Sequence, residues 1–199
     1  MYRITELVGP LALLSLLRGV RVEGEENIPM EPRIIACNQT HNLDSFFLLY
    51  AFLKKTKRPI SFVARKHRDL LRGPINCYAK STGGIMVEKG YYGARNLLIE
   101  GPRALERGNN VGIFPEGRRV MEERLGCFED GAARLSITTR VPIVPAYMNN
   151  YKVPLFGVAT VRIGKAISPD VNGSTNREKA RELTDRVKQA ILELSDYPQ

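Results

Sequence analysis

Residues 33–53 read RIIACNQTHNLDSFFLLYAFL, and this stretch decides the fold. Its first part, residues 33–37, is a short apolar run that predicts a buried β-strand. A polar loop follows, and residues 44–53 are predicted to form a helix. A buried strand that leads through a polar loop into a helix is the repeating unit of α/β sheets.

The same alternation continues along the chain. Strands are predicted at residues 60–64, 84–87, 111–114, 143–147 and 158–163. Helices are predicted at residues 102–107, with proline at the start and Gly108 after the end, and at residues 132–139. A closing amphipathic helix over residues 174–195 starts with the capping box Thr175–x–x–Glu178. We therefore expect an α/β sheet covered by helices on both faces, in a single domain over residues 1–199.

The composition suggests a protein that is attracted to anions. The 199 residues are 43% hydrophobic and 26% charged, which is typical of a globular protein. Thirty Lys and Arg against 21 Asp and Glu give a net charge of +9, which favours nucleic acid, anionic lipid or phosphorylated ligands. Because no helix-turn-helix, RNP-like strand or KH loop is visible, nucleic acid is not expected. A charge that serves solubility alone remains an alternative.

The N-terminal residues 3–18 predict a helix with an apolar stripe and basic ends. This pattern suits a membrane interface and a protein core equally well. The uncharged run at residues 7–17 is about half of the roughly 20 residues that span a bilayer. It is followed directly by Arg18, so we expect neither a spanning helix nor a secretory signal.

The cysteines give little support for a crosslinked or metal-bound protein. Cys37, Cys77 and Cys127 are odd in number, far apart and without a C-x-x-C pair. This pattern predicts neither a disulfide framework nor a zinc site, and it suits a reducing cytosol. We expect no metal and no cofactor.

Two loops that leave predicted strands carry the candidate chemistry, as is usual in α/β sheets. In the first loop, His41 and Asp44 are three residues apart at a helix start. The carboxylate can therefore orient the imidazole as a general base. Alternatively, Asp44 or Asn42 only caps the helix.

The second loop follows the strand at residues 111–114. It offers the carboxylate of Glu116, the backbone of Gly117 and the guanidinium groups of Arg118 and Arg119. Arginine forks are well suited to phosphate, so we interpret this loop as a phosphate-binding segment. A solvated turn is the alternative.

Four blocks carry a resemblance to a known family. They lie at residues 38–44, 83–89, 114–119 and 141–145, and their order and spacing resemble the glycerolipid acyltransferase family, specifically the bacterial 1-acylglycerol-3-phosphate acyltransferases. The third block of that family reads Phe-Pro-Glu-Gly-Thr-Arg. Here Arg118 stands at the threonine, and Lys89 stands at the arginine of the second block. With its supporting phrases, the resemblance covers about residues 20–168.

The resemblance implies a reaction and a location. A fatty acyl group would pass from a thioester of acyl-carrier protein or coenzyme A, as co-substrate, to the hydroxyl of lysophosphatidic acid, giving phosphatidic acid. Acylation of glycerol-3-phosphate or of another lysolipid is the close alternative. The implied fold is a largely parallel sheet of the glycerol-3-phosphate (1)-acyltransferase type. A docking helix over residues 1–19 would hold it on an anionic membrane, as a peripheral or monotopic protein of the cytoplasmic side.

The resemblance also implies roles for individual residues. The acceptor's phosphate is expected on Lys89 and Arg119, with Arg118 and Arg65 as further contacts. Gly117 lies in the same loop. Glu116 would either organise this loop or contact the glycerol.

One position departs from the family pattern. The first block of the family places a histidine, the general base, where this chain has Gln39, and places the orienting aspartate at Asp44. A carboxamide has no titratable proton acceptor near neutral pH. Three interpretations follow: Gln39 is an engineered replacement of histidine, His41 acts as the base, or the protein binds anionic lipid without catalysis.

Overall fold

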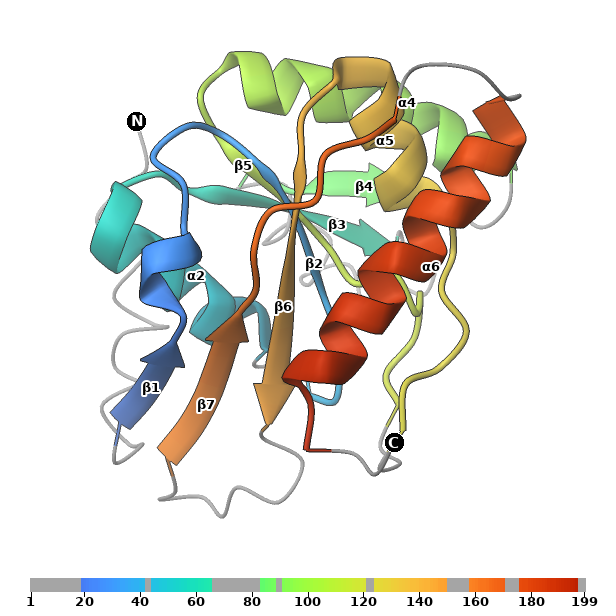
Figure 1. The fold of residues 1–199 in the computed structure, drawn as a ribbon. Coiled ribbons are helices and arrows are strands. Elements are labelled where there is room, and N and C mark those ends of the chain that lie inside the picture. The colour runs from blue at the N-terminus through green and yellow to red at the C-terminus, as the bar shows by residue number, and fades with distance from the viewer. Residues whose placement is uncertain are drawn as a thin grey trace, which may run out of the picture.

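The computed structural model describes residues 19–41, 44–65, 83–88, 91–120, 124–149, 158–170 and 176–196. Residues 1–18 of the docking helix expected over residues 1–19, together with Cys77 and Lys89, lie outside these ranges. Within them, a seven-stranded sheet carries helices on both faces (Figure 1). The predicted α/β fold is confirmed. No helix in this part of the chain combines the length and the apolar character that crossing a membrane requires.

The sheet is parallel except at one pair of neighbours. Its strand order is β1-β7-β6-β2-β5-β3-β4, and only β6 and β7 run antiparallel to each other. The central strand β2 therefore has parallel neighbours, β6 and β5, on its two sides. The strands are β1 (Gly19–Glu23), β2 (Ile34–Cys37), β3 (Ile60–Arg65), β4 (Ile85–Val87), β5 (Asn110–Ile113), β6 (Ile143–Asn149) and β7 (Val158–Ile163).

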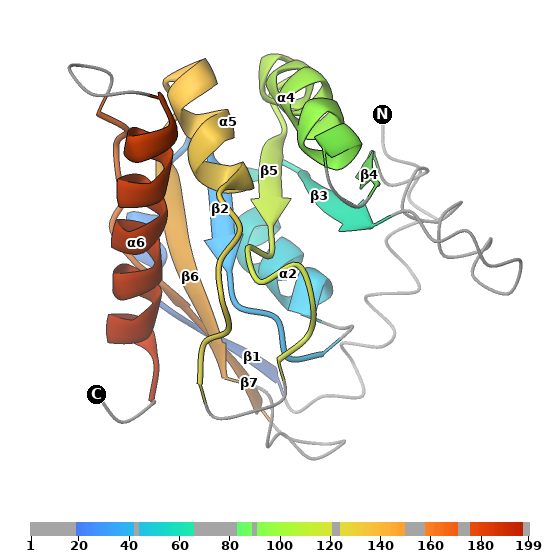
Figure 2. The same ribbon diagram turned by 90° about the vertical axis from the view of Figure 1, so that its right-hand side faces the viewer.

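The helices divide unequally between the two faces (Figure 2). Helix α2 (Asp44–Thr56) packs on one face, together with the short 3-10 helix η1 (Glu25–Asn27) near β7. Helices α4 (Tyr91–Glu106), α5 (Gly131–Thr139) and α6 (Asn176–Leu194) cover the other face.

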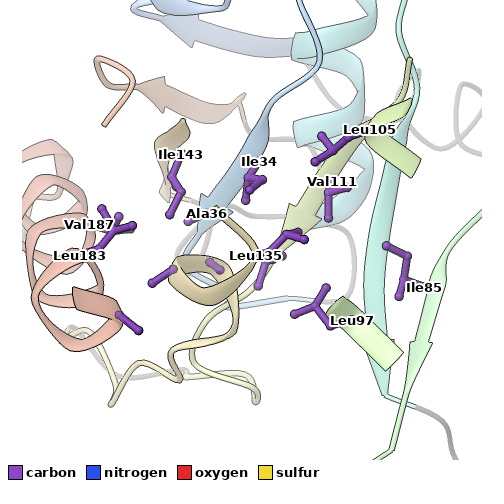
Figure 3. Packing of buried hydrophobic residues seen from close by; sticks show 14 of the residues in the cluster. Ile34, Ala36, Ile85, Leu97, Leu105, Val111, Leu135, Ile143, Leu183 and Val187 are labelled. Carbon is purple, nitrogen blue, oxygen red and sulfur yellow. The ribbon is translucent and has the colours of Figure 1, made fainter. Parts of the chain in front are cut away.

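Alternation along β2 explains how one strand serves two cores. Ile34 and Ala36 point into the cluster beneath α4, α5 and α6, part of which Figure 3 shows. Ile35 and Cys37 point into the cluster beneath α2. All four side chains are fully buried, as expected when successive side chains of a strand face opposite sides of a covered sheet.

The helix predicted at residues 102–107 is wrong in its start. Helix α4 begins at Tyr91, and Pro102 lies in its interior. An interior proline costs a helix about 3 kcal/mol because it removes a backbone hydrogen bond. Burial of Leu97, Ala104 and Leu105 against the sheet offsets this cost. Gly108, at φ 83°, follows the helix as predicted.

Strand β1 was not predicted from the sequence, and it overlaps the end of the expected docking helix at Gly19. It pairs in parallel with β7 along its whole length. Val20 and Val22 pack against the α2 cluster, whereas Arg21 is exposed. At the sheet edge, the Glu23 carboxylate accepts a hydrogen bond from Arg162 Nε at 2.8 Å. A run of five residues in which apolar and polar side chains alternate is too short to be distinguished from a loop in the sequence.

Candidate active site

The two polar loops meet at one edge of the sheet. Strands β2 and β5 are parallel neighbours, so the loops that follow them leave the same edge (Figure 2). The backbone N–H of Gln39 donates to Oε2 of Glu116 at 2.9 Å. The backbone carbonyl of Gln39 accepts from the N–H of Val120, also at 2.9 Å. The second loop therefore holds residue 39 by both of its backbone groups.

Asn38 anchors the first loop to the sheet. Its side chain is buried, and Oδ1 accepts the backbone N–H of Met148 at 2.7 Å. Its Nδ2 donates to the carbonyl of Met148 at 3.1 Å. The carboxamide thus extends the pairing of β2 with β6 by one residue and determines where the loop starts.

Asp44 holds the next two residues of the loop. Its carboxylate is fully buried at the start of α2, and Oδ2 accepts the backbone N–H groups of Thr40 at 2.6 Å and His41 at 2.8 Å. The backbone N–H groups of residues 39, 40 and 41 thus all donate to buried carboxylates, the first to Glu116 and the other two to Asp44. The N–H groups of Thr40 and His41 precede α2, so these bonds fix the loop and are not the helix-capping bonds considered for Asp44 from the sequence.

The two candidates for the base lie on the same loop. The ring of His41 is half-buried, and its Nδ1 is 3.4 Å from the hydroxyl of Thr40. Asp44 accepts the backbone N–H of His41 at 2.8 Å. The Gln39 carboxamide has no hydrogen-bond partner among the described residues.

Glu116 lies between the loops as a buried carboxylate, 6% exposed. Besides Gln39, it bonds the backbone N–H of Gly126 through Oε1 at 2.8 Å. Burial raises the pKa of the Glu116 carboxyl above its ordinary value. The two backbone N–H bonds and the charges of Arg118 and Lys188 oppose this rise without cancelling it.

The backbone of Gly117 lies next to the guanidinium group of Arg65, one of the predicted phosphate contacts. The φ of Gly117, 60°, is a conformation that favours glycine. A Cβ there would lie 2.7 Å from Oε1 of Glu129 and 3.5 Å from Nη2 of Arg65. Arg65, at the end of β3, therefore reaches the backbone of the second loop. Arg118 and Arg119, in that same loop, are exposed.

Lys89 is the predicted phosphate ligand that lies outside the described residues. Strand β4 ends at Val87, which pairs with Arg65 in β3. The second and third blocks therefore approach the same edge of the sheet.

Sequence reasoning missed three residues near the site: Gly126, Glu129 and Lys188. Gly126 and Glu129 follow the third block in sequence, but no motif predicts a role for them at the site. Lys188 comes from α6, and its Nζ lies 5.8 Å from the ring centroid of Phe128. No local motif signals a contact across such a separation. Within the described ranges, no group of three or more His, Cys, Asp and Glu side chains is placed to hold a metal.

A family model described as Acyltransferase matches residues 19–149, from the start of β1 to the end of β6. This chain belongs to the acyltransferase family. The resemblance inferred from the four blocks is therefore confirmed.

Several individual proteins of known name are similar to this chain. A 1-acyl-sn-glycerol-3-phosphate acyltransferase of Pseudomonas aeruginosa is 30% identical over 69% of this chain, and one of Bacillus subtilis is 27% identical over 92%. The alignment spans 92% of the Bacillus subtilis protein but 52% of the Pseudomonas aeruginosa protein. The chain thus spans about half the length of several relatives that it matches.

A solved structure shares the fold. The 1-acyl-sn-glycerophosphate (LPA) acyltransferase PlsC from Thermotoga maritima matches with a TM-score of 0.64 and 24% identity. The match covers 96% of this chain and 78% of that one.

Proposed function

We propose that this protein transfers a fatty acyl group from an acyl thioester to the free hydroxyl of lysophosphatidic acid, giving phosphatidic acid. Membership of the acyltransferase family and the names of the relatives support this reaction. The donor is a thioester of acyl-carrier protein or coenzyme A.

One structural observation carries the proposal. The loop that holds residue 39 is bonded directly to the loop that holds Arg118 and Arg119, and Arg65 approaches the same loop at Gly117. A lysophosphatidic acid molecule presents a phosphate and a hydroxyl a few bonds apart. Cationic groups beside the residue that faces the hydroxyl match that pair of groups.

The reaction assigns a role to each part of the site. The acceptor oxygen attacks the thioester carbonyl carbon, a C–O bond forms, the C–S bond breaks, and the sulfur leaves as a thiolate. The hydroxyl proton passes to a general base. The Gln39 carboxamide can bond the hydroxyl but cannot take its proton. For that reason, the second candidate function is an anionic-lipid-binding protein without catalysis.

An acyl-transfer assay tests the proposal. A labelled thioester, supplied on either carrier, is mixed with lysophosphatidic acid or glycerol-3-phosphate in detergent, with the chain as written and with Gln39→His. Turnover of lysophosphatidic acid by either chain supports the proposal, and turnover of glycerol-3-phosphate alone supports the close alternative. Saturable binding of lysophosphatidic acid without turnover by either chain supports the binding protein.

Replacing Arg119 by Ala is expected to raise the apparent requirement for the phosphorylated acceptor. Loss of a charge-assisted bond to phosphate costs about 1.5–3 kcal/mol, which corresponds to a roughly 10- to 150-fold higher acceptor KM. The measurement is the acceptor KM, or the Kd if the chain only binds. Lys89→Ala is expected to act in the same direction.

Arg103→Ala is the matched control for this prediction. Arg103 is exposed, pairs with Glu100 at 2.8 Å, and lies in the last turn of α4, which leads to the opposite edge of the sheet. The substitution Arg103→Ala therefore removes one positive charge at a distance from the site. If both Arg119→Ala and Lys89→Ala leave acceptor dependence at the level of this control, the phosphate assignment is wrong.

We further propose that the protein docks on the cytoplasmic side of an anionic membrane through its N-terminal segment. The net charge of +9 supports attraction to anionic lipid, and the stripe Ile4, Leu7, Leu11 and Leu14 supports an interfacial helix. The free thiols of Cys37 and Cys127 are consistent with a reducing compartment.

Removing residues 1–18 is expected to weaken binding to anionic liposomes while the remaining chain stays folded. The measurements are liposome flotation at low and high salt and circular dichroism of the truncated protein. Binding by the full chain should fall with added salt because attraction between exposed charges is screened. A truncated chain that unfolds, together with binding that ignores salt and lipid charge, would instead make the segment part of the core.

A further inference from the structure

We propose that Glu116 is a positioning residue that fixes the backbone of residue 39, rather than a ligand of the acceptor. The inference rests on the proposed acyl transfer, because it assigns the residue a part in that reaction. It resolves the two roles that the resemblance left open for Glu116.

Both oxygens of the carboxylate are already engaged. Oε2 accepts the N–H of Gln39 at 2.9 Å, and Oε1 accepts the N–H of Gly126 at 2.8 Å. The side chain is 6% exposed, so little of it is open to an incoming glycerol. A ligand of the acceptor would need an oxygen turned toward the open edge of the site.

The same carboxylate joins three segments of chain. These are residues 38–41, its own loop at residues 114–120, and residues 124–130. Two backbone bonds also join these segments: Val120 N–H to the carbonyl of Gln39, and Glu129 N–H to the carbonyl of Pro115 at 2.7 Å. The side chain of Glu116 thus ties the first and third segments through the second.

Fixing the backbone of residue 39 matters for catalysis because it sets the distance between the side chain at this position and the acceptor hydroxyl. A general base acts only within hydrogen-bond reach of its proton, and a displacement of about 1 Å can cost roughly 100-fold in rate. Without the Glu116 bond, the N–H of residue 39 loses its acceptor, and only the Val120 bond still holds this residue to the second loop. The rise in the pKa of Glu116 on burial fits a group shielded from water and from substrate.

Hydrogen exchange of the chain as written tests the positioning role without any need for activity. In Glu116→Gln, one of the two acceptor oxygens becomes an NH₂ group that faces an N–H donor. The backbone amide of Gln39 or of Gly126 should then exchange about tenfold faster or more, as expected for a lost hydrogen bond. Glu129→Gln is the matched control, since it removes a carboxylate near the same loop without a bond to either amide, and both amides should keep their protection.

Kinetics in the Gln39→His chain test the consequence for the reaction. Adding Glu116→Gln should lower kcat by roughly 10- to 100-fold and leave the acceptor KM within about twofold. Glu116→Asp, which keeps the charge but is one methylene shorter, should also lower kcat. It serves as the second variant if Glu116→Gln does not fold.

The outcomes separate the two ideas. A tenfold or greater rise in acceptor KM at unchanged kcat, or unchanged protection of both amides in the folded variants, overturns the positioning role. If neither the chain as written nor the Gln39→His chain turns over lysophosphatidic acid, the proposed function fails. In that case the exchange measurement still decides whether Glu116 holds residue 39.

Discussion

Gln39→His is expected to raise the rate of acyl transfer to lysophosphatidic acid by about 10²- to 10⁴-fold, the contribution of a positioned general base. The backbone at this position is held by Glu116 and Val120, so a new side chain starts from a defined place. Asp44 lies five residues later, at the spacing that the family uses for its base and orienting carboxylate. The measurement is turnover with a labelled thioester at saturating acceptor.

His41→Ala is the partner experiment. In the Gln39→His background it should change turnover little, because the ring of His41 contacts Thr40 at 3.4 Å in the structure. Four chains are compared: as written, Gln39→His, His41→Ala and the double change. Brisk turnover by the chain as written that His41→Ala abolishes would make His41 the base and shift the first block by two residues.

Asn38→Leu is expected to lower the free energy of unfolding by about 2–6 kcal/mol. Leucine is close in size but leaves both the N–H and the carbonyl of Met148 without the partner they have now. Each buried backbone group that loses its hydrogen bond costs about 1–3 kcal/mol. Urea unfolding followed by circular dichroism measures the difference.

Asn110→Leu provides the matched control. Asn110 is as deeply buried as Asn38, at 1% exposure for each. Its Oδ1 accepts the N–H of Arg33 at 2.9 Å, whereas its Nδ2 has no partner among the described residues. This control should lose about half as much stability as Asn38→Leu. Equal losses would mean that desolvation of the two amides, not the bonds to Met148, sets the cost.

The part of the site that follows from the sequence is the part built by local patterns. Short apolar runs before residues 38 and 115 predict buried strands, and parallel strands bring the loops that follow them to one edge. The contact between Gln39 and Glu116 confirms that the two loops meet. The helix start at Asp44 was likewise predicted from its position after a polar loop.

The remaining parts depend on contacts between distant residues. Nothing near Gly126 in the sequence predicts its bond to Glu116. Arg65 was placed at the site by the family resemblance, and its contact with the loop at Gly117 is visible only in the structure. Helix α4 runs through Pro102 because core packing outweighs a local penalty. Local propensity therefore misplaced its start. These features follow from tertiary packing, which a single sequence does not display.

The two hydrogen bonds made by the backbone N–H and carbonyl of residue 39 have a genetic consequence. The loop is shaped by main-chain bonds to Glu116 and Val120, and neither bond involves the side chain at that position. The codons for glutamine and histidine differ only in their third base. A single nucleotide change therefore exchanges the two side chains on the same main-chain frame. If Gln39→His raises acyl transfer as predicted above, descendants of one gene can gain or lose this activity in one mutational step, without a compensating change elsewhere in the fold.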